Sequence, residues 1–307
     1  MFAAPPDVKA EVFARLPDNL RKQGSASAWL EKHNRGRPRH SLLEGPSFDA
    51  NGALYLVDTA FGRVFKISPE GAFSVVAEYD GQPNGLKIHR DGRIFIADHI
   101  RGLLQLDPGR GAVSTICEEG PDRPFHGLND LFFAGNGDLY MTDQGQTGLQ
   151  DPNGRVYKLT AAGRLELVMA GIPSPNGIVM NSEETCLYVA VTRDNAIWRL
   201  PLMLDGTVSK VGAFIRLSGG IGPDGLALDR QDGLAIAHIG LGCVWMIDRR
   251  GEPCLRVRLP EGNSPTNVAF GGRNFRSLFI TEADSGTVFV VRDAGVQGHK
   301  MFSHPQD

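Results

Sequence analysis

Six copies of one segment pattern run along the chain. Each copy has a small-residue start, a short apolar strand, a polar turn, a second strand with a polar end, and a third strand. A fourth strand follows several copies, as in FSVVAEY at 73–79 and CLRVRL at 254–259. The copies begin at residues 44, 84, 129, 176, 224 and 266, so successive starts lie 40 to 48 residues apart. A period of this length with four short strands per unit is typical of a β-propeller.

The repeats predict an all-β protein, a six-bladed β-propeller, to which the axial residues described below add a central metal site. A length of 307 residues would by itself suggest about two domains. Because blades bury their faces only against neighbouring blades, we instead expect one domain over 1–307. A β-sandwich would not explain six repeats in register. We assign 1–17 to a closing strand, 18–43 to an insert or lid, and 44–307 to the blades.

The ends of the chain bear on how the ring closes. An open ring would leave unpaired strand edges. The segment EVFARLP at 11–17 resembles the fourth strands of the repeats, so we expect it to return to the last blade. The segment GHKMFSH at 298–304 is an alternative outer strand of that blade. The sequence leaves open which of the two lies outermost.

Composition excludes several classes of partner. The net charge of −3 indicates neither a nucleic-acid partner nor an anionic membrane. The N-terminus lacks an apolar stretch of signal-peptide length, and no apolar run of about 18 residues suggests a membrane span. Four cysteines show no CxxC pair and no zinc spacing, so we expect reduced packing residues in a cytoplasmic protein. The oligomeric state is left open.

One polar residue opens the first strand of every repeat. In a propeller this strand is the innermost, so the residue points toward the central axis. The six residues are Glu44, Asn84, Asn129, Asn176, Asp224 and Thr266. All carry a side-chain oxygen, and turn preference explains Asn or Asp before Gly but not Glu44. Oxygen donors without His or Cys suit a hard cation, so we expect one divalent ion, Ca²⁺ first, with Mg²⁺, Mn²⁺ or Zn²⁺ as alternatives.

Five strings in the chain resemble one known family. They are LLEGPSFD at 42–49, LNDLFFAGNGDLYMTD at 128–143, SPNGIVMN at 174–181, GPDGLALD at 222–229 and SPTNVAFGG at 264–272. Together they are similar to the senescence marker protein (regucalcin)/gluconolactonase family, which includes lactonases and a diisopropylfluorophosphatase. The resemblance implies a six-bladed propeller whose single divalent metal is held by Glu44, Asn129, Asn176 and Asp224.

The resemblance also implies a reaction. We expect a metal-dependent lactonase that opens a small, sugar-derived lactone, with Asp224 as general base. A phosphotriesterase-type hydrolase on the same metal site and a non-catalytic metal-binding scaffold are the alternatives. Sugar-lactonase members often carry Arg two places before the second-string Asn, whereas this chain has Gly127. His126 could replace that donor, so the identity of the lactone is left open.

Further polar residues are expected near the site. Asn84 and Thr266 share the axial register, and we expect them to bond to the ligands or to water beside them. Asp130 follows a ligand directly and is expected to orient it. Second strands end in polar residues at the same end of the ring, which makes His99, Arg193 and His238 candidate substrate contacts.

The insert before the first blade is strongly basic. Residues 21–40 carry six Lys or Arg against one Glu. The segment is either a solvated basic loop or a lid that Trp29 and Leu30 anchor by their apolar side chains. A basic lid would favour an anionic substrate, with Arg35, Arg37 and Arg39 as the charges to test.

Overall fold

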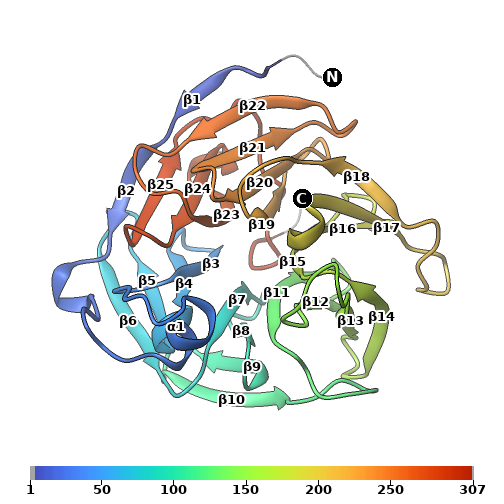
Figure 1. The fold of residues 1–307 in the computed structure, drawn as a ribbon, viewed down its shortest axis with the longest axis horizontal. Helices are drawn as coiled ribbons and strands as arrows, with labels where there is room; N and C mark the ends of the chain where they lie inside the picture. Colours follow the sequence, from blue (N-terminus) through green and yellow to red (C-terminus); the bar gives the residue numbers. More distant parts are fainter. Residues whose placement is uncertain (1–3, 306–307) are drawn as a thin grey trace.

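A computed structural model describes residues 4–305. Six β-sheets surround a central axis, as in a propeller, and the chain visits them in order around the ring (Figure 1). The innermost strand of each sheet touches the innermost strands of both neighbours, which closes the circle. The predicted six-bladed architecture is therefore confirmed.

Each repeat of the sequence forms one blade. Blade 1 contains β3 (Leu43–Phe48), β4 (Leu54–Asp58), β5 (Arg63–Ile67) and β6 (Phe73–Glu78). Blade 2 contains β7 (Pro83–Ile88), β8 (Ile94–Asp98), β9 (Gly102–Asp107) and β10 (Ala112–Cys117). Blade 3 contains β11 (Leu128–Phe133), β12 (Leu139–Asp143), β13 (Gly154–Leu159) and β14 (Leu165–Ile172).

The second half of the ring follows the same plan. Blade 4 contains β15 (Pro175–Met180), β16 (Cys186–Val191), β17 (Ala196–Pro201) and β18 (Gly212–Arg216). Blade 5 contains β19 (Gly222–Leu228), β20 (Leu234–Ile239), β21 (Cys243–Ile247) and β22 (Pro253–Arg258). Blade 6 contains β23 (Pro265–Gly271), β24 (Ser277–Glu282) and β25 (Thr287–Val291). Within each blade the strands are named from the axis outward, and neighbouring strands pair antiparallel.

The N-terminal segment joins the last two blades. β2 (Glu11–Arg15) pairs antiparallel with β25 and is the outer strand of blade 6. β1 (Asp7–Lys9) pairs parallel with β22 as a fifth strand of blade 5. Asp7 accepts hydrogen bonds from Arg256 and Arg258, which fixes this short strand. The sequence did not predict β1, because three residues are too few to show a strand pattern.

Apolar alternation explains how the blades pack. Side chains of a strand point alternately to its two faces, and each blade lies between two neighbours. In β4, Leu54 and Leu56 pack into the core shared with blade 6, whereas Tyr55 and Val57 pack into the core shared with blade 2. Both faces are thus buried, which is why the second strands read as nearly continuous apolar runs.

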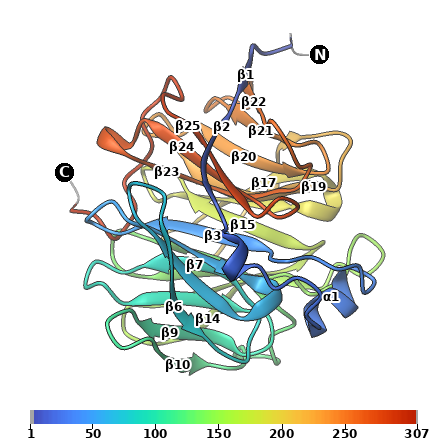
Figure 2. The same ribbon diagram turned by 90° about the vertical axis from the view of Figure 1, so that its left-hand side faces the viewer.

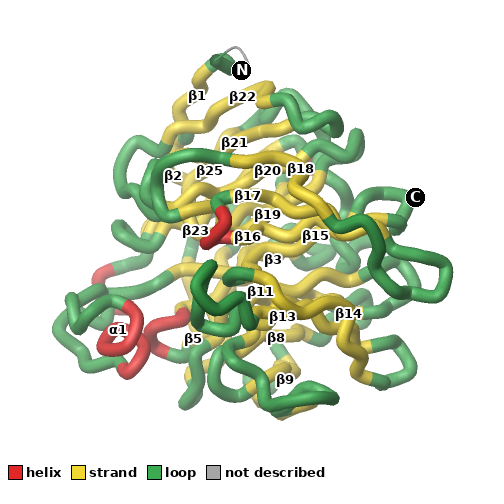
Figure 3. The backbone as a smooth tube through the Cα atoms, turned by 45° about the vertical axis from the view of Figure 1, so that its right-hand side comes forward, coloured by secondary structure: helices red, strands yellow, loops and turns green. Residues whose placement is uncertain are grey.

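Helices are short and lie outside the sheets (Figure 3). The elements are η1 (Asp18–Leu20), α1 (Ala28–His33), η2 (Thr59–Phe61), η3 (Thr192–Asp194) and η4 (Arg273–Phe275). None of the helices within residues 4–305 is long and apolar enough to span a membrane. Helix α1 and the C-terminal segment lie on opposite faces of the ring (Figure 2). We call the face that carries α1 the mouth.

The C-terminal segment 298–304 is not an outer strand of blade 6, so that alternative is wrong. β2 already occupies this edge, and the segment instead crosses the far end of the channel. His299 donates its backbone N–H to Leu228 of blade 5, and the Ser303 hydroxyl donates to the Phe48 carbonyl of blade 1. Phe302 stacks on Phe133 of blade 3 at 4.9 Å between ring centroids. Burial of these apolar side chains keeps the segment beneath the ring.

Pairing of β2 with β25 predicts the effect of removing the closing strand. Deletion of residues 1–17 should lower the unfolding midpoint and broaden the transition, because blade 6 would keep three strands and expose an edge. Circular dichroism during urea unfolding measures this. Two point variants of β2 give a matched comparison. Ala14→Asp places a charge in the core and should destabilise the fold, whereas Val12→Asp alters a side chain that is 38% exposed. An unchanged, equally sharp transition in the deletion variant would rule out this closure.

Candidate functional site

A backbone irregularity marks the mouth end of every inner strand. The register between first and second strands slips between Glu44 and Ser47, Pro83 and Gly85, Leu128 and Leu131, Pro175 and Ile178, Pro223 and Leu226, and Pro265 and Asn267. Such bulges bend a strand and re-aim its side chains. In every blade the inner strand carries one residue more than the second strand across this slip.

Glycines beside the axial residues permit the inner strands to approach one another. A Cβ atom on Gly85 would lie 2.5 Å from the carbonyl oxygen of Asn129, and one on Gly177 would lie 2.5 Å from that of Asp224. Blades 1, 2 and 4 therefore press this glycine against the axial residue of the next blade. The Asn-Gly and Asp-Gly pairs at 84–85, 176–177 and 224–225 lie within inner strands and serve this close approach, so they are not hairpin turns.

The six axial residues are all buried, between 2% and 7% exposed. The side-chain oxygens Oδ1 of Asn129 and Asn176 have no hydrogen-bond partner among the described residues. An unpaired buried amide oxygen costs roughly 1–3 kcal/mol, so a ligand for these two atoms would stabilise the site. A cation at the axis would be such a ligand.

Two buried carboxylates share the site with these amides. Burial and the charge of Asp130 raise the pKa of Glu44 to about 8. Burial, followed by the charges of Glu44 and Asp130, raises the pKa of Asp224 well above its usual range, against the opposing effects of Asn176 and Arg193. Negative charge is therefore unfavourable here until a positive charge compensates it.

The donor set fits a hard divalent cation. Two carboxylates and two free amide oxygens are ligands of the type that Ca²⁺ accepts. Over residues 4–305, no group of three or more His, Cys, Asp and Glu side chains is arranged to hold a metal ion. A cation at the axis would thus depend on Asn129 and Asn176 as much as on the acids.

Asp130 and Asn267 meet across the axis below these donors. Blades 3 and 6 lie opposite each other in a ring of six, and they lack the glycine that other blades carry at this position. The Asn267 amide donates to Glu44 Oε2 at 3.0 Å and to Asp130 Oδ2 at 3.4 Å. Lys87 Nζ approaches Asp130 Oδ1 at 3.4 Å from the far side. Asn267 therefore orients Glu44. The sequence pattern instead predicts such a contact for Thr266, the residue before it.

Thr266 does not support the ligands as expected. Its hydroxyl donates to the Leu43 carbonyl at 2.7 Å and lies 2.8 Å from the Thr281 hydroxyl, so it joins blade 6 to blade 1. Asn84 lies in the axial ring, and its Nδ2 is 3.2 Å from His99 Nε2. Asn84 thereby connects the axis to the mouth.

His238 is also misplaced as a substrate contact. It is fully buried, its Nε2 lies 3.1 Å from the Gly219 carbonyl, and its Nδ1 accepts from the Trp245 indole at 3.1 Å. Both ring nitrogens are therefore committed to the interior of blade 5. His99 and Arg193, in contrast, lie at the mouth.

His126 and Gly127 lie on the mouth loop of blade 3. The His126 side chain is exposed, and its backbone N–H donates to Asp143 at 2.9 Å. Gly127 has φ 121°, and a Cβ atom there would lie 2.6 Å from Gln146 Nε2 and 2.9 Å from His99 Nδ1. No arginine fits at this position, so Gln146 and His99 provide the polar groups that line it.

The insert covers part of the mouth. Ser27 caps α1 by accepting from the Leu30 backbone, and its hydroxyl donates to the Ala60 carbonyl at 2.6 Å. Leu30 packs with Ala60 of blade 1 and Ala283 of blade 6. The His33 ring lies nearly parallel to that of His99 of blade 2, with 6.3 Å between centroids. Helix α1 thus reaches from blade 6 across blade 1 to blade 2.

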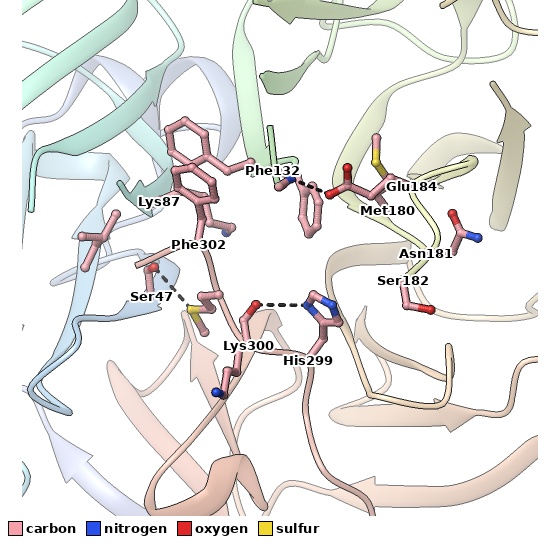
Figure 4. Close-up of a pocket in the computed structure, with 14 residues that line it drawn as sticks. Ser47, Lys87, Phe132, Met180, Asn181, Ser182, Glu184, His299, Lys300 and Phe302 are labelled. Carbon is pink, nitrogen blue, oxygen red and sulfur yellow. Dashed lines mark hydrogen bonds between the residues drawn. The ribbon is translucent and has the colours of Figure 1, made fainter. Parts of the chain in front are cut away.

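A separate cavity of about 200 Å³ lies at the far end of the channel (Figure 4). Phe132 and Met180 form one side, and His299, Lys300 and Phe302 of the C-terminal segment form the other. The Asp130–Asn267 contact lies between the axial donors and this cavity, and the C-terminal segment lines the cavity from the far end. A substrate of the axial site would therefore approach from the mouth.

Comparisons with known proteins show which family the chain belongs to. Residues 42–284 match the model of the SMP-30/gluconolactonase/LRE-like region. The chain belongs to this family. Lactonase drp35 of Staphylococcus aureus strain MRSA252 is 28% identical over 298 residues, which cover 91% of this chain and 90% of the relative. The drp35 of strain bovine RF122 is 30% identical over 248 residues, covering 77% and 74%.

Solved structures of the family share the fold. A calcium-binding regucalcin from Agrobacterium tumefaciens superposes with a TM-score of 0.78 at 23% identity, covering 98% of both chains. A gluconolactonase from Xanthomonas campestris has a TM-score of 0.73 at 22% identity, covering 97% of this chain and 98% of its own. These likenesses support the propeller and its ring of inner strands.

Proposed function

We propose that this protein is a divalent-metal-dependent lactonase that opens a small, sugar-derived lactone to its hydroxy acid. Glu44, Asn129, Asn176 and Asp224 would hold the cation. The observation that carries this proposal is the pair of unpartnered amide oxygens beside two buried carboxylates at the axis. Its relatives named as lactonases support the reaction class.

Ca²⁺ is the cation that the donors favour. All four donors are oxygens, Mg²⁺ demands near-octahedral geometry, and Zn²⁺ usually recruits His or Cys. The regucalcin of similar fold is described as calcium-binding. When bound, the cation would supply Lewis-acid polarisation of the lactone carbonyl.

Asp224 is proposed as the general base. Its carboxylate is buried at the axis, where it can accept a proton from a water molecule beside it. Asp224 takes a proton from the attacking water, whose oxygen bonds to the carbonyl carbon. The bond from that carbon to the ring oxygen then breaks, and the proton passes to the departing alkoxide. Asn267 keeps Glu44 in place, and α1 packs over blades 1 and 6 at the mouth.

Metal removal tests this function. Incubation with EDTA should abolish hydrolysis of a panel of sugar, uronic and aliphatic lactones, and added Ca²⁺ should restore it. Asn176→Ala should weaken cation binding in calorimetry while circular dichroism keeps the wild-type spectrum, since the side chain lies at a strand end. Asn181→Ala, on the same blade at the far end, is the matched control. A wild-type protein that binds no divalent cation would refute the axial site.

A phosphotriesterase reaction is the second candidate, favoured by the apolar side chains around the mouth. Ile100, Leu149, Ile221 and Leu241 lie on mouth-end loops and are between 38% and 64% exposed. Such a rim would suit a bulky apolar ester. Paraoxon in the same panel distinguishes the two reactions, because a lactonase should leave it intact while opening a lactone.

A further inference from the structure

The mouth carries several exposed positive charges that lack an acidic partner among the described residues. Four cations of this face, Lys32, Arg35, Arg37 and Arg193, are exposed and form no ion pair with any residue in 4–305. Other basic residues of the insert are neutralised. Arg39 pairs with Asp284 at 2.8 Å, and Lys22 pairs with Glu78 at 2.9 Å. The free positive charge is therefore concentrated in a few residues.

Arg193 stands beside the axial donors. It belongs to η3 at the mouth end of blade 4, and η3 contacts β19, the strand of Asp224. The preceding Thr192 hydroxyl donates to the Pro223 carbonyl at 2.8 Å, so the backbone of Arg193 is held against that strand. Arg193 is therefore fixed at the mouth beside the strand that carries Asp224.

Lys32 belongs to helix α1, which covers another part of the same opening. It precedes His33, whose ring lies over His99. Its charge contributes to lowering the pKa of both histidines, and burial together with His33 brings the pKa of His99 to about 3. The histidines are neutral at physiological pH, so the charge on this side comes from the lysine.

We propose that the lactone opened by this protein carries an anionic group, a carboxylate or phosphate, which Arg193 and Lys32 attract and orient at the mouth. This inference rests on the proposed lactonase function. Two unpaired cations, one on the blade 2 side and one on the blade 4 side of the entrance, raise the local concentration of an anion. The anionic group would remain at the rim between blades 2 and 4, while the ring carbonyl reaches the axial donors. A neutral lactone would lack that attraction.

A matched pair of substrates tests the proposal. Glucono-1,5-lactone and its 6-phosphate share one ring and differ in one charged group. The wild type should favour the phosphate in kcat/KM, and Arg193→Gln with Lys32→Gln should reduce kcat/KM for it by roughly tenfold through KM, with little change for the neutral lactone. The preference should shrink at high salt because the charges are exposed. Equal losses for both lactones would overturn the proposal and leave the lactonase function standing.

A control and a binding measurement complete the test. Arg164→Gln removes one positive charge at the far end, in the turn between β13 and β14, where the side chain is 76% exposed. This control should leave kcat/KM unchanged for both lactones. Calorimetry with 6-phosphogluconate and gluconate measures anion selectivity without turnover. Tighter binding of the phosphate that the double variant loses supports anion recognition by Arg193 and Lys32 independently of turnover, and equal binding of both acids overturns it.

Discussion

Replacing Asp224 by asparagine is expected to lower kcat by roughly 10²-fold or more, the scale typical of losing a general base. The amide nearly matches the carboxylate in shape, so blade 5 should fold and some cation affinity should remain. Asparagine cannot accept the proton that the attacking water must release. Steady-state kinetics on the best lactone, at saturating Ca²⁺, measures the loss in kcat against KM.

Two other variants separate this role from charge and from folding. Glu44→Gln removes the other axial carboxylate and should mainly weaken cation binding. Asp229→Asn changes a buried Asp of the same blade, whose Oδ1 accepts from the Gln231 and Gly233 backbones, and should affect stability rather than kcat. Normal cation binding with a wild-type rate in Asp224→Asn would exclude Asp224 as the base. Trapping of an acyl-enzyme would overturn direct attack by water.

Much of the ring was predictable because it depends on local patterns. Strand alternation and turn residues repeat in every blade, so their period alone specified six units. The residues that open the first strands were all found buried near the axis, as a ring of inner strands requires. β2 was also predictable, since its apolar pattern matches that of an outer strand and blade 6 needed one.

Backbone irregularities account for the errors near the axis. An alternating pattern has no way to show that the bulge also turns the residue after the axial one toward the axis, so Thr266 was expected beside the ligands and Asn267 was not. A signal did exist: Asp130 and Asn267 replace the glycine that follows the axial residue in the other four blades. Two larger polar side chains on opposite blades must meet, and they do.

Contacts between distant segments could not be predicted from the sequence. His238 looked like a mouth residue because it ends a second strand, but its partners Gly219 and Trp245 come from a loop and another strand. The stacking of His33 on His99 joins residues 66 positions apart (99 − 33) and depends on how a six-residue helix is anchored. Neither contact has a period that a pattern could reveal.

Replacing Arg63 by methionine should destabilise the fold by about 3–5 kcal/mol, because it leaves a buried carboxylate without its partner. Arg63 is 1% exposed, its Nε donates to Asp58 at 3.0 Å, and its Nη1 donates to the Leu20 carbonyl at the start of the insert. Asp58 in turn accepts from the Leu42 backbone at 2.8 Å, so this ion pair holds both ends of the insert on blade 1.

Urea unfolding with matched variants tests this account. Arg93→Met breaks an ion pair with Asp91 whose side chains are 47% and 43% exposed, and it should cost no more than about 1 kcal/mol. Arg63→Met combined with Asp58→Leu should recover part of the loss, since an apolar pair of similar volume needs no compensation. If Arg63→Met alone stays within about 1 kcal/mol of the wild type, water must reach Asp58, and the insert cannot be anchored by this pair.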